Sequence, residues 1–319
     1  MRILAIDGGG IRGLIPAVVL AEIEQRTGRR IAELFDLIAG TSTGGILACG
    51  LTRPGDDGTP AFRAADLIGL YESEGPEIFH RSQLRRVASA EGYVDERYDD
   101  AGLNAALHRY LGATTLSQAL TDLFITAYEI ERRTPFFFRS SRAREDPAHD
   151  FTLVEAARAT AAAPTYFAPY RVRDVSGAAT WTLIDGGLFA ANPAMAAYAE
   201  LQADGRADEV DLVVSLGTGR ATRRLAYDQV RDWGRLEWAR PMLDVVFDGV
   251  SQVVDRELAQ LLGPGRHIRL QTRLDEAGDD LDDASDRNLD ALRRDGRRLV
   301  AERSDDLDRI AALVAASPA

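Results

Sequence analysis

The sequence has a single cysteine, Cys49, no lysine and only four histidines in 319 residues. One cysteine excludes an intrachain disulfide and a cysteine-built zinc site, and it fits a reducing compartment. Cys49 lies in a short run of small apolar residues, so we expect a buried and unreactive thiol. All 38 basic residues are arginines, a bias of composition from which no mechanism follows.

The sequence also lacks a long hydrophobic run and an excess of positive charge. Its first six residues are mainly apolar but end at Asp7, too short for the core of a signal peptide, and no later stretch approaches a membrane span. We therefore expect a cytoplasmic protein that reaches any lipid from the aqueous side, by peripheral contact with a membrane. The 50 acidic residues give a formal charge of -12, which repels nucleic-acid phosphates, so no nucleic-acid partner is expected.

The hydrophobic pattern predicts one α/β domain over residues 1–319. Residues 2–6 and 35–39 form predicted buried strands, with a predicted helix at 14–26 between them. Such a unit implies a parallel sheet whose ligands bind at the carboxyl ends of the strands. Further predicted strands are 123–128, 180–184 and 210–216, and further predicted helices are 153–162, 193–203 and 238–261.

Two regions differ from this regular pattern. Residues 54–98 combine a Pro/Gly/Asp-rich loop with a stretch that has no clear periodicity, which predicts a variable insertion or cover where substrate access is decided. Residues 281–316 are crowded with aspartate and arginine, yet leucines recur there at helical intervals. We expect solvated terminal helices docked on the sheet.

Gly40-Thr41-Ser42-Thr43-Gly44 fits the G-x-S-x-G nucleophile elbow and stands between a predicted strand and a predicted helix, as that motif requires. The flanking glycines permit a strained turn that exposes Ser42, and the helix directs its N-terminal amides at the hydroxyl. Ser42 is therefore the candidate nucleophile. The alternative is a glycine-rich turn with a helix-capping serine.

Residues 7–13 read Asp-Gly-Gly-Gly-Ile-Arg-Gly and follow the first predicted strand directly. Their side-chain-free amides can converge on a developing oxyanion. Dinucleotide binding is a competing interpretation, because Gly8, Gly10 and Gly13 satisfy G-x-G-x-x-G. That motif also expects an acidic residue at the end of the second strand, where this sequence has the Ser42 elbow.

A serine nucleophile needs a base, and Asp185 is one candidate. It directly follows a predicted strand and precedes Gly186 and Gly187, so it would lie at the same carboxyl edge as Ser42. Spacing alone leaves a capping or turn aspartate equally open. A carboxylate, with a reference pKa of about 4, must also be desolvated before it can act as a base.

His267 is the other candidate base, since no other histidine follows Asp185 in the Ser-Asp-His order of α/β-hydrolases. Its surroundings alternate like a strand, which is typical of a structural or surface histidine. Those folds also place several strands before the elbow, whereas Ser42 comes early. Asp185 is therefore the preferred base.

The three motifs together resemble the signature of patatin-like phospholipases: a DGGG-x-R-G loop, a G-x-S-x-G elbow and a later DGG. Further segments similar to that family are residues 161–167, Asn192-Pro193, 215–219 and 281–285. The resemblance therefore covers nearly the whole chain and is closest to the plant-patatin and related bacterial branch.

The resemblance implies a three-layer α/β/α fold with a central, mostly parallel sheet and the elbow between a strand and a helix. It implies a Ser-Asp dyad, glycine-loop amides as oxyanion donors, and no metal or organic cofactor. The site residues it implies are Ser42 and Asp185 as the catalytic pair, Gly8, Gly9, Gly10 and Arg12 at the oxyanion hole, Gly40 and Gly44 at the elbow, and Gly186, Gly187 and Asn192 as supporting residues.

Three functional hypotheses follow. The first is a serine acyl hydrolase, a phospholipase A or lipid acyl hydrolase that cleaves fatty-acyl esters of glycerolipids, with a phospholipid or other acyl lipid as its partner. The second, from resemblance to patatin-like proteins of bacterial antiphage systems, is an effector phospholipase triggered by a signal such as a cyclic nucleotide. Arg81, Arg85 and Arg86 are candidates for its phosphate contacts, although exposed arginines are commonly only solvated. The third is a non-catalytic storage or interaction protein, against which the intact motifs argue. The sequence leaves the oligomeric state open.

Overall fold

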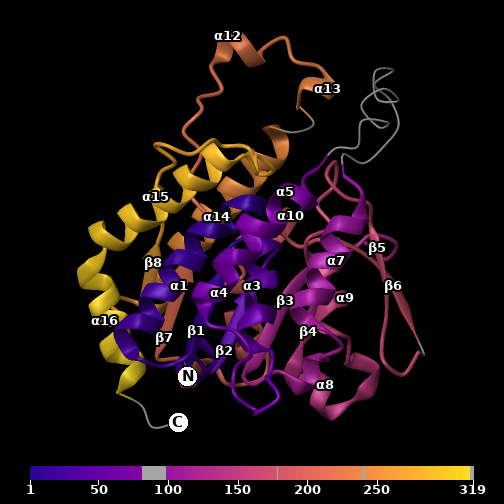
Figure 1. Cartoon of the computed structure of the whole chain (residues 1–319), viewed down its shortest axis with the longest axis vertical. Coiled ribbons are helices and arrows are strands. Elements are labelled where there is room, and N and C mark those ends of the chain that lie inside the picture. Colours follow the sequence, from indigo (N-terminus) through magenta and orange to yellow (C-terminus); the bar gives the residue numbers. More distant parts are fainter. Residues whose placement is uncertain (81–97, 178, 239–240, 317–319) are drawn as a thin grey trace.

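The computed structural model describes residues 1–80, 98–177, 179–238 and 241–316. In these residues, eight strands form one sheet at the centre of the molecule, and helices lie on both of its faces (Figure 1). The strands are β1 (Arg2–Ile6), β2 (Leu37–Gly40), β3 (Asp122–Glu129), β4 (Thr134–Arg139), β5 (Tyr170–Arg173), β6 (Thr180–Asp185), β7 (Leu212–Leu216) and β8 (His267–Leu270).

The pairing runs in the order β5-β6-β3-β2-β1-β7-β8, and β4 also pairs with β3. Strands β3, β2, β1, β7 and β8 are parallel to one another. Strands β4 and β6 are antiparallel to β3, and β5 is antiparallel to β6. The predicted α/β architecture with a mostly parallel sheet is confirmed.

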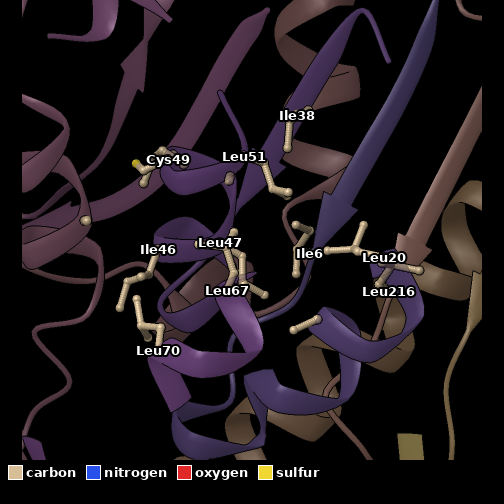
Figure 2. Close-up of a cluster of buried hydrophobic side chains, with 14 of the residues drawn as sticks. Ile6, Leu20, Ile38, Ile46, Leu47, Cys49, Leu51, Leu67, Leu70 and Leu216 are labelled. Atoms are coloured by element: carbon tan, nitrogen blue, oxygen red, sulfur yellow. The ribbon is translucent and has the colours of Figure 1, made fainter. Parts of the chain in front are cut away.

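Alternate residues of the central strands pack against helices on opposite faces, which gives three layers. On one face, Leu4, Ile6 and Ile38 pack in a cluster with α1 (Leu14–Thr27) and α3 (Thr43–Thr52), and Figure 2 shows part of this cluster. On the other face, the alternate residues of the same strands pack with α11 (Ala194–Ala203) and α14 (Pro241–Leu262).

Most of the remaining helices surround this core. They are α2 (Ile31–Leu34), α4 (Ala64–Gly69), α5 (Gly75–Ile78), α7 (Asp100–Leu111), α8 (Ser140–Glu145), α9 (Leu153–Thr160), α10 (Gly187–Ala190), α12 (Tyr227–Val230), α13 (Arg235–Trp238), α15 (Asp286–Glu302) and α16 (Ser304–Ala315). No helix in the described ranges is both long enough and apolar enough to cross a membrane.

Several predicted boundaries are corrected. Strand β2 spans 37–40 instead of 35–39, because the Phe35 N–H closes the turn of α2 by donating to the carbonyl of Ile31. The terminal helix α15 begins at Asp286 instead of near 281, because the side chain of Ser285 accepts the Asn288 N–H and caps the helix there. The prediction that Cys49 is buried is confirmed.

Residues 54–80, which together with Tyr98 are the described part of the predicted cover, contain more regular structure than their sequence indicated. They form α4, a π-helix at Leu70–Glu74 and α5. Residues 81–97, with Arg81, Arg85 and Arg86, lie outside the described residues.

Candidate active site

Ser42 stands in a strained turn between β2 and α3. Its backbone angles are φ 53° and ψ -124°, a conformation rare for a residue with a side chain, and its N–H donates to the hydroxyl of Thr160 at 2.8 Å. Gly40 ends β2, and Gly44 lies so close to β1 that a β-carbon there would collide with the carbonyl oxygen of Ile6. The elbow predicted from the sequence is thus formed, with Ser42 at its apex.

Asp185 lines the same pocket as Ser42, because of a strand arrangement that the sequence did not predict. Along β3, Gly40 pairs with Ile125 and Asp185 pairs with Ala127, while β4 pairs with both of these β3 residues. Since a residue in a sheet has one neighbour on each side, β2 and β6 must lie on the same side of β3. The two strands therefore run toward each other, and their carboxyl ends stop about 7 Å apart along β3.

The Asp185 carboxyl is fully buried, and burial raises its pKa to about 7. The Ser42 hydroxyl and the Gly187 N–H act in the opposite direction, and the latter donates to Oδ1 at 2.7 Å. Oδ2 has no hydrogen-bond partner in the described part of the chain, so the hydroxyl lies near the carboxyl without a fully formed bond. Such contacts commonly tighten when substrate binds.

The backbone around Asp185 is held by its neighbours. The Asp185 N–H donates to the carbonyl of Ala162 at 3.0 Å. Gly186 packs against Thr126 and Gly187 against Phe247, each with no room for a β-carbon. Both glycines therefore allow the close approach that their motif predicted.

The glycine loop after β1 lies directly against Ser42. A β-carbon at Gly8 would be 3.2 Å from that of Ser42. The Gly8 N–H is already used, since it donates to the carbonyl of Ala191 at 2.9 Å, whereas the amides of Gly9 and Gly10 have no partner among the described residues. Of the three amides considered from the sequence, only these two are free to bind an anion.

Position 10 requires glycine for two reasons, its backbone conformation and its contact with Leu281. Its φ is +56°, and a β-carbon there would collide with the carbonyl of Leu281. That same carbonyl accepts the Ile11 N–H at 2.9 Å. The segment before α15 thus clamps the glycine loop in place.

Arg12 is buried but does not line the pocket that holds Ser42. Burial lowers the pKa of its guanidinium, while the nearby carboxylates Asp248, Asp244 and Asp279 raise it. Nη1 donates to the backbone carbonyl of Asp279 at 3.5 Å. The structure therefore places the Arg12 side chain toward this acidic group.

A buried ion pair lies beneath the glycine loop. Arg269 of β8 donates to both carboxylate oxygens of Asp7, with 2.8 Å between Nη1 and Oδ1. Ser251 donates to the same carboxylate at 2.7 Å, and Ser215 accepts from Arg269 at 2.7 Å. Asn192 donates to Ser215 at 3.0 Å, which connects this predicted supporting residue to the network.

None of the four histidines lines the pocket that holds Ser42. His267 begins β8 opposite Val213, about 10 Å along the strands and about 14 Å across them from the elbow. Its nearest carboxylate is Asp255, at 3.8 Å, and burial lowers its pKa. The other three histidines are exposed. His267 therefore cannot act as the base for Ser42.

Ser42 and Asp185 open into one apolar pocket. The cover contributes Leu70, Tyr71, Ile78 and Phe79 to its wall. The Tyr71 hydroxyl and the Thr43 hydroxyl, next to Ser42, are hydrogen bonded at 2.6 Å. The other lining residues are Gly10, Ile11, Thr43, Ile46, Gly75, Leu103, Ala161, Ala163, Tyr166, Phe167, Phe247 and Leu281.

A family model described as patatin-like phospholipase matches residues 4–198, which include Ser42 and Asp185. The chain belongs to this family. It is 35% identical to "Patatin-like protein 2" and 31% identical to "Patatin-like protein 4", both of Arabidopsis thaliana, over 94% of this chain and 83% of each relative. It is 30% identical to "Probable inactive patatin-3-Kuras 1" of Solanum tuberosum, over 94% of this chain and 86% of that protein.

Membership of the patatin-like phospholipases supports a hydrolase that acts on lipid acyl substrates. In this patatin-like chain, the roles of Arg269, Thr160 and Phe247, which contact the motif residues, were not predicted from the sequence. Leu281 lies in the segment 281–285 that resembles the family, but its contact with Gly10 was not predicted. Arg269 also left a signal, because an arginine between Ile268 and Leu270 in a strand-like run must find a partner if it faces inward. The partner itself could not be read from the run.

Proposed function

We propose that this protein is a serine acyl hydrolase that cleaves fatty-acyl esters of glycerolipids, with Ser42 as nucleophile and Asp185 as base. The observation that carries the proposal is that Ser42 and the fully buried Asp185 share one apolar pocket. A base works best when its pKa lies near the operating pH, and burial raises that of Asp185 to about 7. A solvated carboxylate would be a much weaker base.

In the first half of the reaction, Asp185 takes the hydroxyl proton while Ser42 Oγ attacks the ester carbonyl carbon. The negative charge that develops on the carbonyl oxygen is bound by the free amides of Gly9 and Gly10, at the end of a loop that Leu281 holds in place. When the tetrahedral intermediate collapses, the ester bond breaks and Asp185 gives its proton to the leaving alcohol. An acyl-serine remains.

In the second half, a water molecule gives a proton to Asp185 and attacks the acyl carbon. Collapse of the second tetrahedral intermediate returns the proton to Ser42 Oγ and releases the fatty acid. The apolar pocket wall favours an alkyl chain, because its side chains offer dispersion contacts and few hydrogen-bond partners. No step requires a metal or an organic cofactor.

The experiment that tests this function is hydrolysis of a medium-chain p-nitrophenyl ester and of phosphatidylcholine by wild type, Ser42→Ala and Asp185→Asn. His267→Ala is the matched control, since it also removes a buried polar side chain. We expect the first two variants to lose activity by about 100-fold or more and the control to retain it. Equal loss in His267→Ala would overturn the dyad.

Fluorophosphonate labelling separates an active serine from a vestigial site. Wild type should label and Ser42→Ala should not. A folded wild-type protein that neither labels nor hydrolyses ester would support the storage or interaction hypothesis, and one similar protein of Solanum tuberosum is named as a probable inactive patatin.

A further inference from the structure

Residues 222–238, which we call the α12–α13 segment, stand away from the body of the protein. Figure 1 shows α12 and α13 above the rest of the chain, at the end opposite the N-terminus. At its base, the N–H groups of Thr222 and Arg223 donate to the two carboxylate oxygens of Asp279, at 3.0 and 2.8 Å. Beyond Arg223, every hydrogen bond recorded for the described residues stays within the segment.

This segment concentrates aromatic side chains at the surface. It holds two of the three tryptophans of the chain, Trp233 and Trp238, whose rings pack edge to face with centroids 5.2 Å apart. Tyr227 is 75% exposed, the largest value among the exposed large hydrophobic residues described. Met242 and Val245, on the first turns of α14, are 53% and 51% exposed. Tyr227, Met242 and Val245 thus expose apolar surface at this end of the molecule.

The net charge of the segment is opposite in sign to that of the protein. Residues 222–238 contain four arginines against three acidic residues, while the whole chain carries -12. Arg231 is half exposed and pairs with acidic residues inside the segment, Asp228 and Asp232. Arg224 is exposed as well. The segment therefore presents arginines to solvent on an otherwise acidic molecule, where they favour an anionic partner.

The segment also lies at the end of the sheet where the pocket is found. It leaves the body shortly after β7, and β7 is parallel to β1 and β2, so it emerges from the same carboxyl edge as Ser42. On the helix that follows it, Phe247 lines the pocket two residues beyond the exposed Val245. A surface that covered the segment would thus approach the pocket.

We propose that the α12–α13 segment, with Met242 and Val245, docks this protein on an anionic lipid surface and so delivers lipid to the pocket. Tryptophan and tyrosine partition to the membrane interface, and arginines at its level pair with lipid phosphates. The delivery of lipid to the pocket rests on the proposed function, whereas the docking step itself requires no catalysis.

Docking is tested by co-sedimentation of Ser42→Ala protein, which cannot consume the lipid, with vesicles of phosphatidylcholine alone or of equal parts phosphatidylcholine and phosphatidylglycerol. We expect binding to the anionic vesicles only, and binding that weakens as salt is added. The variant Tyr227→Ser/Arg224→Glu/Arg231→Glu should lower the partition coefficient at least about tenfold.

The matched control is Leu261→Ser/Arg256→Glu. Leu261 is 58% exposed on the same α14 helix, but lies about 28 Å along it from Met242, beyond the depth of an interfacial contact. This control should bind as the parent protein does. Equal binding by parent and segment variant would overturn the proposal.

Tryptophan fluorescence locates the contact independently of these variants. Trp181 packs against Phe136 and Phe151 in the body, so Trp181→Phe leaves Trp233 and Trp238 as the only tryptophan reporters. Anionic vesicles should shift their emission to the blue, and brominated lipid should quench it. An unchanged spectrum on vesicles that bind the protein would show that another surface docks.

The two proposals can fail separately. If the segment docks but wild type neither hydrolyses ester nor labels with fluorophosphonate, the proposed function fails and the docking inference stands. If wild type hydrolyses the water-soluble ester and the segment variant cleaves vesicle lipid as fast as wild type does, the docking inference fails and the function stands.

Discussion

Gly40 and Asp185 end two strands that run toward each other along the same side of β3, opposite Ile125 and Ala127. Gly40 leads into the elbow, so the head-on meeting of β2 and β6 brings Ser42 to a carboxylate that comes from a distant part of the sequence. That carboxylate is fully buried where it lines the pocket shared with Ser42.

The first prediction concerns the pH dependence of activity. Asp185 must be ionised to accept a proton, and burial raises its pKa to about 7. We expect kcat/KM for a water-soluble ester to fall about tenfold per pH unit below that pKa and to level off above it. A profile that levels off near pH 4, the reference value of a solvated aspartate, would contradict Asp185 as the base.

The second prediction is that the buried Asp185 carboxyl lowers the free energy of unfolding as the pH rises above its unfolded pKa. Between its unfolded value of 3.8 and its folded value of about 7, the unfolded chain releases a proton that the folded chain keeps, so the free energy of unfolding falls as pH rises. Asp185→Asn removes this loss. It should raise the free energy of unfolding by up to about 4 kcal/mol at pH 8 and change it little at pH 4, measured by urea denaturation. Equal effects at both pH values would contradict the assigned shift.

The third prediction concerns the ion pair beneath the glycine loop. Arg269→Met leaves Asp7 buried without its partner and should lower the free energy of unfolding by about 3–5 kcal/mol. The matched control is Arg294→Met, which breaks an exposed pair with Glu276 and should cost less than about 1 kcal/mol. Adding Asp7→Asn to Arg269→Met should recover part of the loss. A double variant as unstable as the sum of the single variants would show that the pair is not coupled.

The fourth prediction concerns chain-length preference. Leu103 of α7 lines the pocket, while Leu107, one turn further on, is equally buried but lies outside it. Leu103→Phe fills space that an acyl chain would occupy, so kcat/KM should fall at least about tenfold for a decanoyl ester and much less for an acetyl ester. Leu107→Phe serves as the control for overpacking, and it should leave the ratio of the two activities unchanged. A similar ratio in both variants would place the acyl chain elsewhere.

Sequence reasoning predicted much of the site because its parts are local. The G-x-S-x-G turn, the glycine loop and the DGG motif each depend on a few consecutive residues whose backbone needs are visible in their types. It also placed Asp185 at the correct edge of the sheet, but for an incomplete reason. The expected strand end is there, yet β6 reaches it from the opposite direction, as an antiparallel strand.

Residue types and local patterns specify the local structures: buried strands, the strained serine turn and glycines where the chain must pass close to itself. Which of these local structures meet depends on the tertiary fold. It placed Asp185 beside Ser42 and His267 at the far edge, paired Asp7 with Arg269, and used the Gly8 amide to hold Ala191. Local periodicity records which side of a strand faces the core, but strand order, direction and register arise from contacts between residues far apart in the chain, and those contacts set the geometry of the site.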